Sequence, residues 1–76
     1  MSSTETKDRI HQIRKALRLN RTEFGELIGC SYRSVYYYET GARKPSFTTC
    51  YKIVVIAHKN GLKDVDIEWL RPDQDE

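Results

Sequence analysis

Apolar residues recur at helical spacing in the first part of the chain. Ile10, Ile13 and Leu17 stand three and four residues apart, and most positions between them are charged or polar. Such a stripe is typical of an amphipathic helix that buries one face, so the pattern predicts a helix over about residues 6–19. The small polar residues at the start of the chain predict a flexible N-terminus over residues 1–8.

Two short helices are predicted next, with a very short connection between them. Asn20 is a good N-cap, and Glu23 stands three residues later, where its carboxylate can reach back to the cap. Gly29 ends this helix, because glycine adopts the left-handed conformation without penalty. Ser31 then caps a helix over residues 31–40. Two short helices joined so closely must cross at a steep angle.

The helix over residues 31–40 has two different faces. Val35 and Tyr38 fall on one side, which is predicted to pack against the core. Tyr32 lies on the flank, near the exposed N-terminal end. The side chains predicted to point outward are Arg33, Tyr36, Tyr37 and Thr40.

Residues 47–70 leave two structures open. Helical spacing after Ser46 favours a helix with an apolar stripe of Phe47, Cys50, Ile53 and Ala57. The β-branched run 53–56 is a poor helix former, however, and apolar residues alternate with acidic ones beyond the turn-like Asn60-Gly61. We predict helices here, the last one short and capped by Asp64 or Asp66, with a β-hairpin as the alternative.

Composition limits the kind of function. Seventy-six residues, 38% hydrophobic and 32% charged, make one small domain that is too short for most enzymes. The sequence contains no catalytic constellation, so we expect no enzymatic activity, no cofactor and no small-molecule substrate. Two cysteines and two histidines lack the spacing of a zinc site, so we expect no metal. No apolar run has membrane-spanning length, and we expect a cytoplasmic protein without membrane contact.

Charge is unevenly distributed along the chain. Residues 9–59 hold ten Lys and Arg against three Glu, whereas residues 60–76 hold two basic against six acidic side chains. A basic body is typical of a protein that binds a polyanion, although a mixed solvated surface fits the same numbers. We expect one domain over residues 9–70 and an acidic C-terminal tail over residues 71–76.

The segment RTEFGELIGCSYRSVYYYET, residues 21–40, resembles the helix-turn-helix of the Cro/C1-type (XRE family) regulators. Gly25 stands where the two helices come close and Gly29 stands at the bend. The run YETGARKPS, residues 38–46, is similar to the segment that follows the recognition helix in that family. The resemblance implies a compact all-α, five-helix, lambda-repressor-like domain, although some Cro relatives replace the last helices by strands.

The resemblance also implies a function. Proteins of this family are DNA-binding transcriptional regulators that bind double-stranded operators as homodimers. We therefore expect a repressor that binds a palindromic operator, with the helix over residues 31–40 in the major groove. A homodimer fits because one such helix covers only a few base pairs.

Individual positions are expected to contact DNA in two ways. Arg33 is the best candidate for reading bases, because guanidinium binds guanine in a bidentate manner. The full set expected at bases is Tyr32, Arg33, Tyr36 and Tyr37. The set expected at phosphates is Arg21, Thr22, Ser31, Arg43, Lys44 and Ser46. The resemblance also implies a structural salt bridge between Arg14 and Glu39.

The tyrosines depart from the family pattern, which mostly presents small, polar or basic side chains on this helix. Their rings could cover thymine methyl groups and their hydroxyls could reach phosphate. The alternative is a protein-interaction module, such as an antitoxin, that uses this tyrosine-rich face, because tyrosine is enriched at interface hot spots. The candidate dimer contacts, which could equally close the small core, are Ile56, Leu62, Val65, Trp69 and Leu70.

Overall fold

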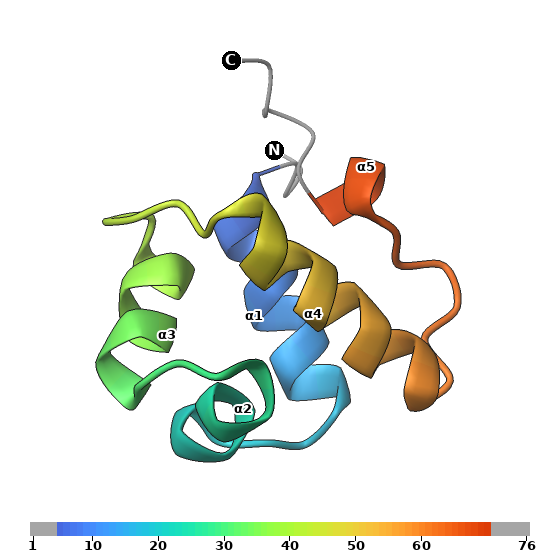
Figure 1. Ribbon diagram of the computed structural model, residues 1–76, viewed down its shortest axis with the longest axis horizontal. Coiled ribbons are helices and arrows are strands. Elements are labelled where there is room, and N and C mark those ends of the chain that lie inside the picture. Colours follow the sequence, from blue (N-terminus) through green and yellow to red (C-terminus); the bar gives the residue numbers. More distant parts are fainter. Residues whose placement is uncertain (1–4, 71–76) are drawn as a thin grey trace.

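The computed structural model describes residues 5–70 and contains five helices, with no strand in that range (Figure 1). These are α1 (Thr6–Ala16), α2 (Arg21–Ile28), α3 (Tyr32–Thr40), α4 (Phe47–Lys59) and α5 (Ile67–Leu70). The predicted all-α class is confirmed, and the β-hairpin alternative is wrong. Of the flexible N-terminus expected over residues 1–8, the first four lie outside the described residues, and α1 begins at Thr6. The expected acidic tail over residues 71–76 also lies outside them.

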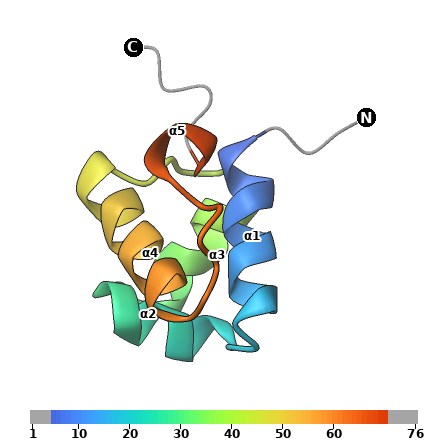
Figure 2. The same cartoon turned by 90° about the vertical axis from the view of Figure 1, so that its right-hand side faces the viewer.

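The helices surround one apolar core. Helix α4 crosses in front of α1 in Figure 1, and the perpendicular view in Figure 2 shows that the two helices lie on opposite sides of the molecule. Helix α2 lies across one end, where it packs against α3 and α4, and α5 lies at the other end, where it packs against α4 and the start of α1 (Figure 2). The buried hydrophobic side chains come from all five helices and from the loop before α5: Ile10, Ile13, Phe24, Ile28, Val35, Cys50, Ile53, Val54, Ala57, Val65 and Leu70.

Burial explains why the β-branched run stays helical. Ile53 and Val54 both lie in the core, at a position where α4 faces the other helices. Helix propensity differs by only about 0.7 kcal/mol among ordinary residues, whereas burying an apolar side chain contributes roughly 1.5–3 kcal/mol. Packing of these two side chains therefore outweighs their weak preference for strands.

The first helix is shorter than the spacing predicted. It ends at Ala16, with Leu17 as its C-cap, and Arg18 then adopts a left-handed conformation with φ of 61°. This turn redirects the chain, and Arg14 Nη1 donates to the Leu19 carbonyl oxygen at 2.9 Å. The chain thereby reaches Asn20 ready to start α2.

The joint between α2 and α3 depends on two glycines. Gly29 caps α2 in the left-handed conformation, with φ of 76°. A Cβ atom on Gly25 would lie 2.5 Å from the Cys30 carbonyl oxygen, so only glycine lets the turn approach α2 this closely. The predicted capping box is confirmed, since Glu23 N donates to Asn20 Oδ1 and Asn20 N donates to Glu23 Oε1.

Side chains also fix the short last helix. Trp69 N donates to Asp66 Oδ1 at 2.7 Å, so of the two predicted caps the structure uses Asp66. Arg9 Nη1 donates to the Trp69 carbonyl oxygen at 2.6 Å, and its guanidinium carbon lies 4.7 Å from the centre of the Trp69 ring. His58, at the end of α4, hydrogen-bonds with the Val65 carbonyl oxygen. The contacts of Arg9 hold α5 against α1, and that of His58 holds the loop before α5 against α4.

Candidate nucleic-acid interface

The outer and inner faces of α3 differ in their exposure to solvent. Val35 is fully buried, and Tyr38 packs against the core as predicted. Burial raises the pKa of the Tyr38 hydroxyl, and its neighbour Cys30 adds to this rise. Tyr32, Arg33 and Tyr36 are exposed and Tyr37 is half-buried.

Arg33 is available for a ligand. Its side chain is exposed on the first turn of α3, and within residues 5–70 it takes part in no ion pair. A guanidinium there can reach outward from the N-terminal end of the helix, which is the part of a recognition helix that meets base edges. Arg33 therefore has the exposure and charge that a base-reading residue needs.

Two arginines stack on the tyrosines of α3. The guanidinium carbon of Arg21 lies 5.3 Å from the centre of the Tyr36 ring, and that of Arg43 lies 5.6 Å from the centre of the Tyr37 ring. The two rings are neighbours, with centroids 6.0 Å apart and planes tilted by 57°. We call these four residues, Arg21, Tyr36, Tyr37 and Arg43, the arginine–tyrosine row.

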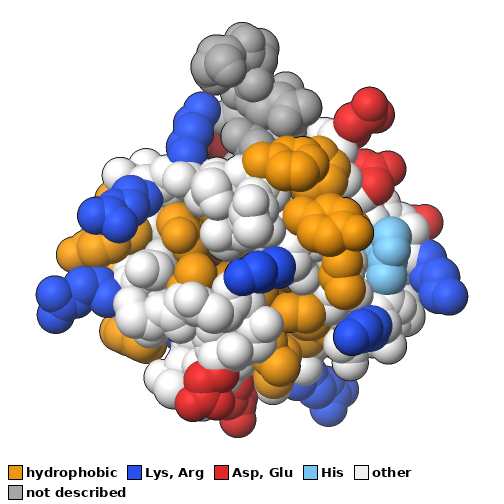
Figure 3. Space-filling view, viewed as in Figure 1, with side chains coloured by type: hydrophobic (Ala, Val, Ile, Leu, Met, Phe, Trp, Pro, Cys, Tyr) orange, Lys and Arg blue, Asp and Glu red, His pale blue; other side chains and the backbone are white. Residues whose placement is uncertain are grey.

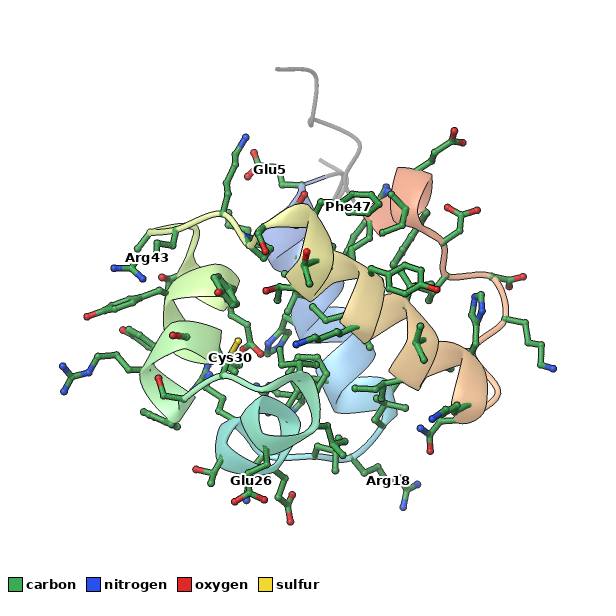
Figure 4. All side chains as sticks on the ribbon, in the orientation of Figure 1. Glu5, Arg18, Glu26, Cys30, Arg43 and Phe47 are labelled. Atoms are coloured by element: carbon green, nitrogen blue, oxygen red, sulfur yellow. The ribbon has the colours of Figure 1, made fainter. Side chains whose placement is uncertain are left out.

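The arginine–tyrosine row combines apolar ring surface with two positive charges. Arg21 comes from the start of α2 and Arg43 from the loop after α3, so the row spans three segments of the chain (Figure 4 shows Arg43 beside α3). Each cation–π contact contributes roughly 0.5–1 kcal/mol at an exposed site. Sequence reasoning named all four residues separately and missed their stacking, because no sequence signal specifies it.

A buried carboxylate lies behind this row. Only 2% of the Glu39 side chain is exposed, and three basic side chains surround it. Arg14 binds it in a bidentate manner, with Nε 2.6 Å from Oε2 and Nη2 3.1 Å from Oε1. His11 Nδ1 and Arg21 Nε lie 3.1 and 3.2 Å from Oε1. Glu39 therefore links α1, α2 and α3.

The basic partners decide the protonation of Glu39. Burial acts to raise the pKa of this carboxyl, but the hydrogen bonds from Arg14 and His11 and the charges of Arg14 and Arg21 outweigh it. The net result is a lowered pKa, so Glu39 stays ionised at neutral pH. The resemblance implied only the Arg14–Glu39 pair. The contact between His11 and Glu39 depends on how α1 packs against α3, which no local sequence pattern specifies.

The remaining phosphate candidates lie at the starts of helices. Thr22 is on the first turn of α2, while Ser31 and Ser46 are the N-caps of α3 and α4 and accept hydrogen bonds from Ser34 N and Thr49 N. All three are exposed, as are Arg43 and Lys44 in the loop between α3 and α4. Helix N-termini favour anions through their free amides and dipoles. The exposed positions of these residues suit contacts with a phosphate backbone.

The candidate dimer contacts do not share one exposed surface. Val65 and Leu70 are buried in the core of a single chain, so neither is available to a second copy. Ile56, Leu62 and Trp69 are partly exposed, and Arg9 covers part of the Trp69 ring. Two of the five candidate side chains are therefore part of the core of a single chain.

Neither a membrane-spanning helix nor a cluster of metal ligands is found among the described residues. No helix among them is long and apolar enough to cross a bilayer. Residues 5–70 contain no group of three or more His, Cys, Asp or Glu side chains placed to hold a metal ion. Cys30 and Cys50 are free thiols, one partly and one fully buried.

The fold and the exposed third helix define a helix-turn-helix protein. A family model described as helix-turn-helix matches residues 10–56, which is more than half of the chain. The chain therefore belongs to the Cro/C1-type (XRE) helix-turn-helix family, whose members are DNA-binding transcriptional regulators. Comparison with curated proteins and with solved structures gave no match.

Proposed function

We propose that this protein is a sequence-specific repressor that binds a palindromic operator as a homodimer, with α3 in the major groove. The observation that carries the proposal is the outer face of α3, where an exposed Arg33 stands beside the arginine–tyrosine row. Charge and apolar ring surface on one protruding helix fit a groove that presents both acceptors and thymine methyl groups.

Each part of this face has a role in the proposal. Arg33 reads guanine O6 and N7, and Tyr32, Tyr36 and Tyr37 cover thymine methyl groups or extend their hydroxyls to phosphate. Arg21, Arg43 and Lys44 contact phosphates, together with Thr22, Ser31 and Ser46 at helix starts. Two copies one helical turn apart then provide the affinity that a single helix lacks.

Selection of bound sequences from a random duplex pool tests the proposal. A recovered motif with two-fold symmetry supports a sequence-specific dimer, and a pool without any enriched motif contradicts it. Binding to the recovered duplex should also weaken linearly with salt on a log–log scale, because several phosphate contacts release counterions.

The same measurements address a protein-binding role for the tyrosine face. Tyr36 is exposed enough to serve as an interface hot spot. A protein-interaction module or antitoxin that used this face would show modest salt dependence and a large loss of partner binding after Tyr36→Ala. Enrichment of one duplex motif would count against that alternative.

A further inference from the structure

A second exposed surface lies on α4, away from the outer face of α3. Outside α3, the large hydrophobic side chains that are more than half exposed are Leu27, Phe47 and Tyr51. Phe47 and Tyr51 stand one helical turn apart on α4, and a shallow hollow joins Tyr51 to Leu27, Val55 and Ile56. We call these five residues the α4 patch. Hydrophobic side chains gather over α4 in the space-filling view, with Lys and Arg side chains among them (Figure 3).

We infer that the α4 patch is the surface through which two copies of this chain associate. The inference rests on the proposed function to the extent that an operator-binding homodimer needs such a surface. It replaces the candidate contacts near the C-terminus, two of which are buried, and keeps only Ile56 from them.

The size of the patch suits a second copy. Aromatic side chains bury about 150–250 Å² each, so Phe47, Tyr51 and Leu27 leave on the order of 300 Å² of mostly apolar surface in solvent. Val55 and Ile56, both partly exposed, add to it. A standard interface buries about 800 Å² per partner, of which roughly 60% is apolar. The α4 patch with its polar rim approaches that requirement.

The charged side chains around the patch are compatible with self-association. Lys52 and Lys59 border the hollow on α4, whereas the exposed Glu26 stands beside Leu27 on α2. Phe47 and Glu26 lie toward opposite edges of this face (Figure 4). Side chains of both signs therefore stand around the patch, so a second copy would not meet a surface of a single charge.

The spacing along α4 fits a two-fold axis near Tyr51. Phe47 and Val55 stand four residues before and after it, on the same side of the helix. Two α4 helices that cross at Tyr51 would place the Phe47 of each copy against the Val55 of the other. In this arrangement α3, which faces another direction in Figure 1, stays free in both copies.

Sedimentation equilibrium of the full chain without DNA tests the inference. The wild-type protein should shift from 8.9 kDa toward twice that mass as concentration rises. Tyr51→Glu should weaken the dimer at least roughly 30-fold, as expected for a central aromatic contact. The matched control is Tyr32→Glu, because Tyr32 is 53% exposed against 55% for Tyr51 but lies on α3. It should associate like the wild type.

Several outcomes would overturn the inference. A wild-type protein that stays monomeric up to sub-millimolar concentration contradicts it, and so does a Tyr51→Glu variant that dimerises normally. Val55→Glu provides a second variant in the same patch if Tyr51→Glu alters the circular dichroism spectrum. Dimerisation through the α4 patch without any duplex preference would overturn only the proposed function. Specific binding of a palindromic duplex by a dimer that Tyr51→Glu and Val55→Glu leave intact would overturn only this inference.

Discussion

The Nε of Arg21 lies 3.2 Å from Oε1 of Glu39, so a residue at the start of α2 shares a buried carboxylate with Arg14 of α1. The same guanidinium stacks on Tyr36. Arg21 therefore belongs both to the scaffold that fixes α3 and to the surface that α3 presents. A substitution here acts on the position of Tyr36 as well as on charge.

Arg21→Lys should separate these two roles. Lysine keeps the positive charge but lacks the planar fork that can donate to Glu39 and stack on a ring at the same time. We expect weaker binding to the selected duplex with an unchanged slope in log salt, because the number of neutralised phosphates stays the same. Fluorescence anisotropy across a salt series measures both quantities. Binding by Arg21→Lys as tight as that of the wild type would mean that the charge alone matters.

Glu39→Gln should destabilise the fold strongly. The neutral amide leaves Arg14 buried without a counter-charge, and breaking a buried ion pair at one partner costs about 3 kcal/mol or more. Urea denaturation measures the free energy of unfolding. The control is Glu26→Gln on the exposed side of α2, which should change that free energy by less than about 0.5 kcal/mol. Equal losses of unfolding free energy in Glu39→Gln and Glu26→Gln would show that Glu39 has no special structural role.

The lowered pKa of Glu39 also predicts a pH dependence. Its folded pKa lies below its unfolded value of about 4.3. The stability that the carboxylate contributes is therefore fully present above the unfolded pKa, and is lost as pH falls through the folded pKa. The difference in the free energy of unfolding between the wild type and Glu39→Gln should therefore shrink below about pH 4. Urea midpoints for both proteins across an acid series test this, and a constant difference would contradict it.

Gly25→Ala should destabilise the fold. Replacing glycine by alanine inside a helix usually has the opposite effect. Alanine normally improves a helix by roughly 0.5–1 kcal/mol over glycine. Here its Cβ would lie 2.5 Å from the Cys30 carbonyl oxygen, and overpacking of this kind costs about 1–3 kcal/mol. Thermal unfolding should show a lower midpoint, while Glu26→Ala on the same helix should stay close to the wild type. A raised midpoint for Gly25→Ala would mean that the turn at Cys30 can move to accommodate the methyl group without cost.

Local backbone requirements were the part of the fold that could be predicted. Asn20, Glu23, Gly29 and Ser31 each meet a condition set within three or four residues, so the helix boundaries at the bend follow from spacing alone. The fate of residues 47–70 could not be settled in this way. Helical spacing favoured helices there and the β propensity of the run 53–56 favoured a strand; burial of Ile53 and Val54 in the core explains why the helix forms.

The exposure of the candidate site residues on α3 could be predicted from the sequence, but their arrangement in space could not. Exposure of Arg33 and Tyr36 follows from helical period, because both point away from the side of the helix that carries Val35 and Tyr38. The meeting of His11 and Arg21 at Glu39 spans 28 and 18 residues and depends on how three helices cross. Likewise, Leu70 is buried because the other helices leave part of the small core uncovered, and no local sequence pattern predicts this.

Arg33→Ala and Arg43→Ala should change DNA binding in different ways. If Arg33 reads a base, its loss relaxes the preference at one position of the selected motif and costs about 1–3 kcal/mol there. If Arg43 neutralises a phosphate, its loss weakens binding to all duplexes alike and reduces the salt slope by about one. Competition with single-base variants of the motif, repeated at several salt concentrations, separates the two effects. Both arginines are exposed, so Arg33→Ala should change the free energy of unfolding by less than about 0.5 kcal/mol, and Arg43→Ala, which also loses its contact with the Tyr37 ring, by no more than about 1 kcal/mol. Uniform weakening by Arg33→Ala would assign that residue to the backbone instead.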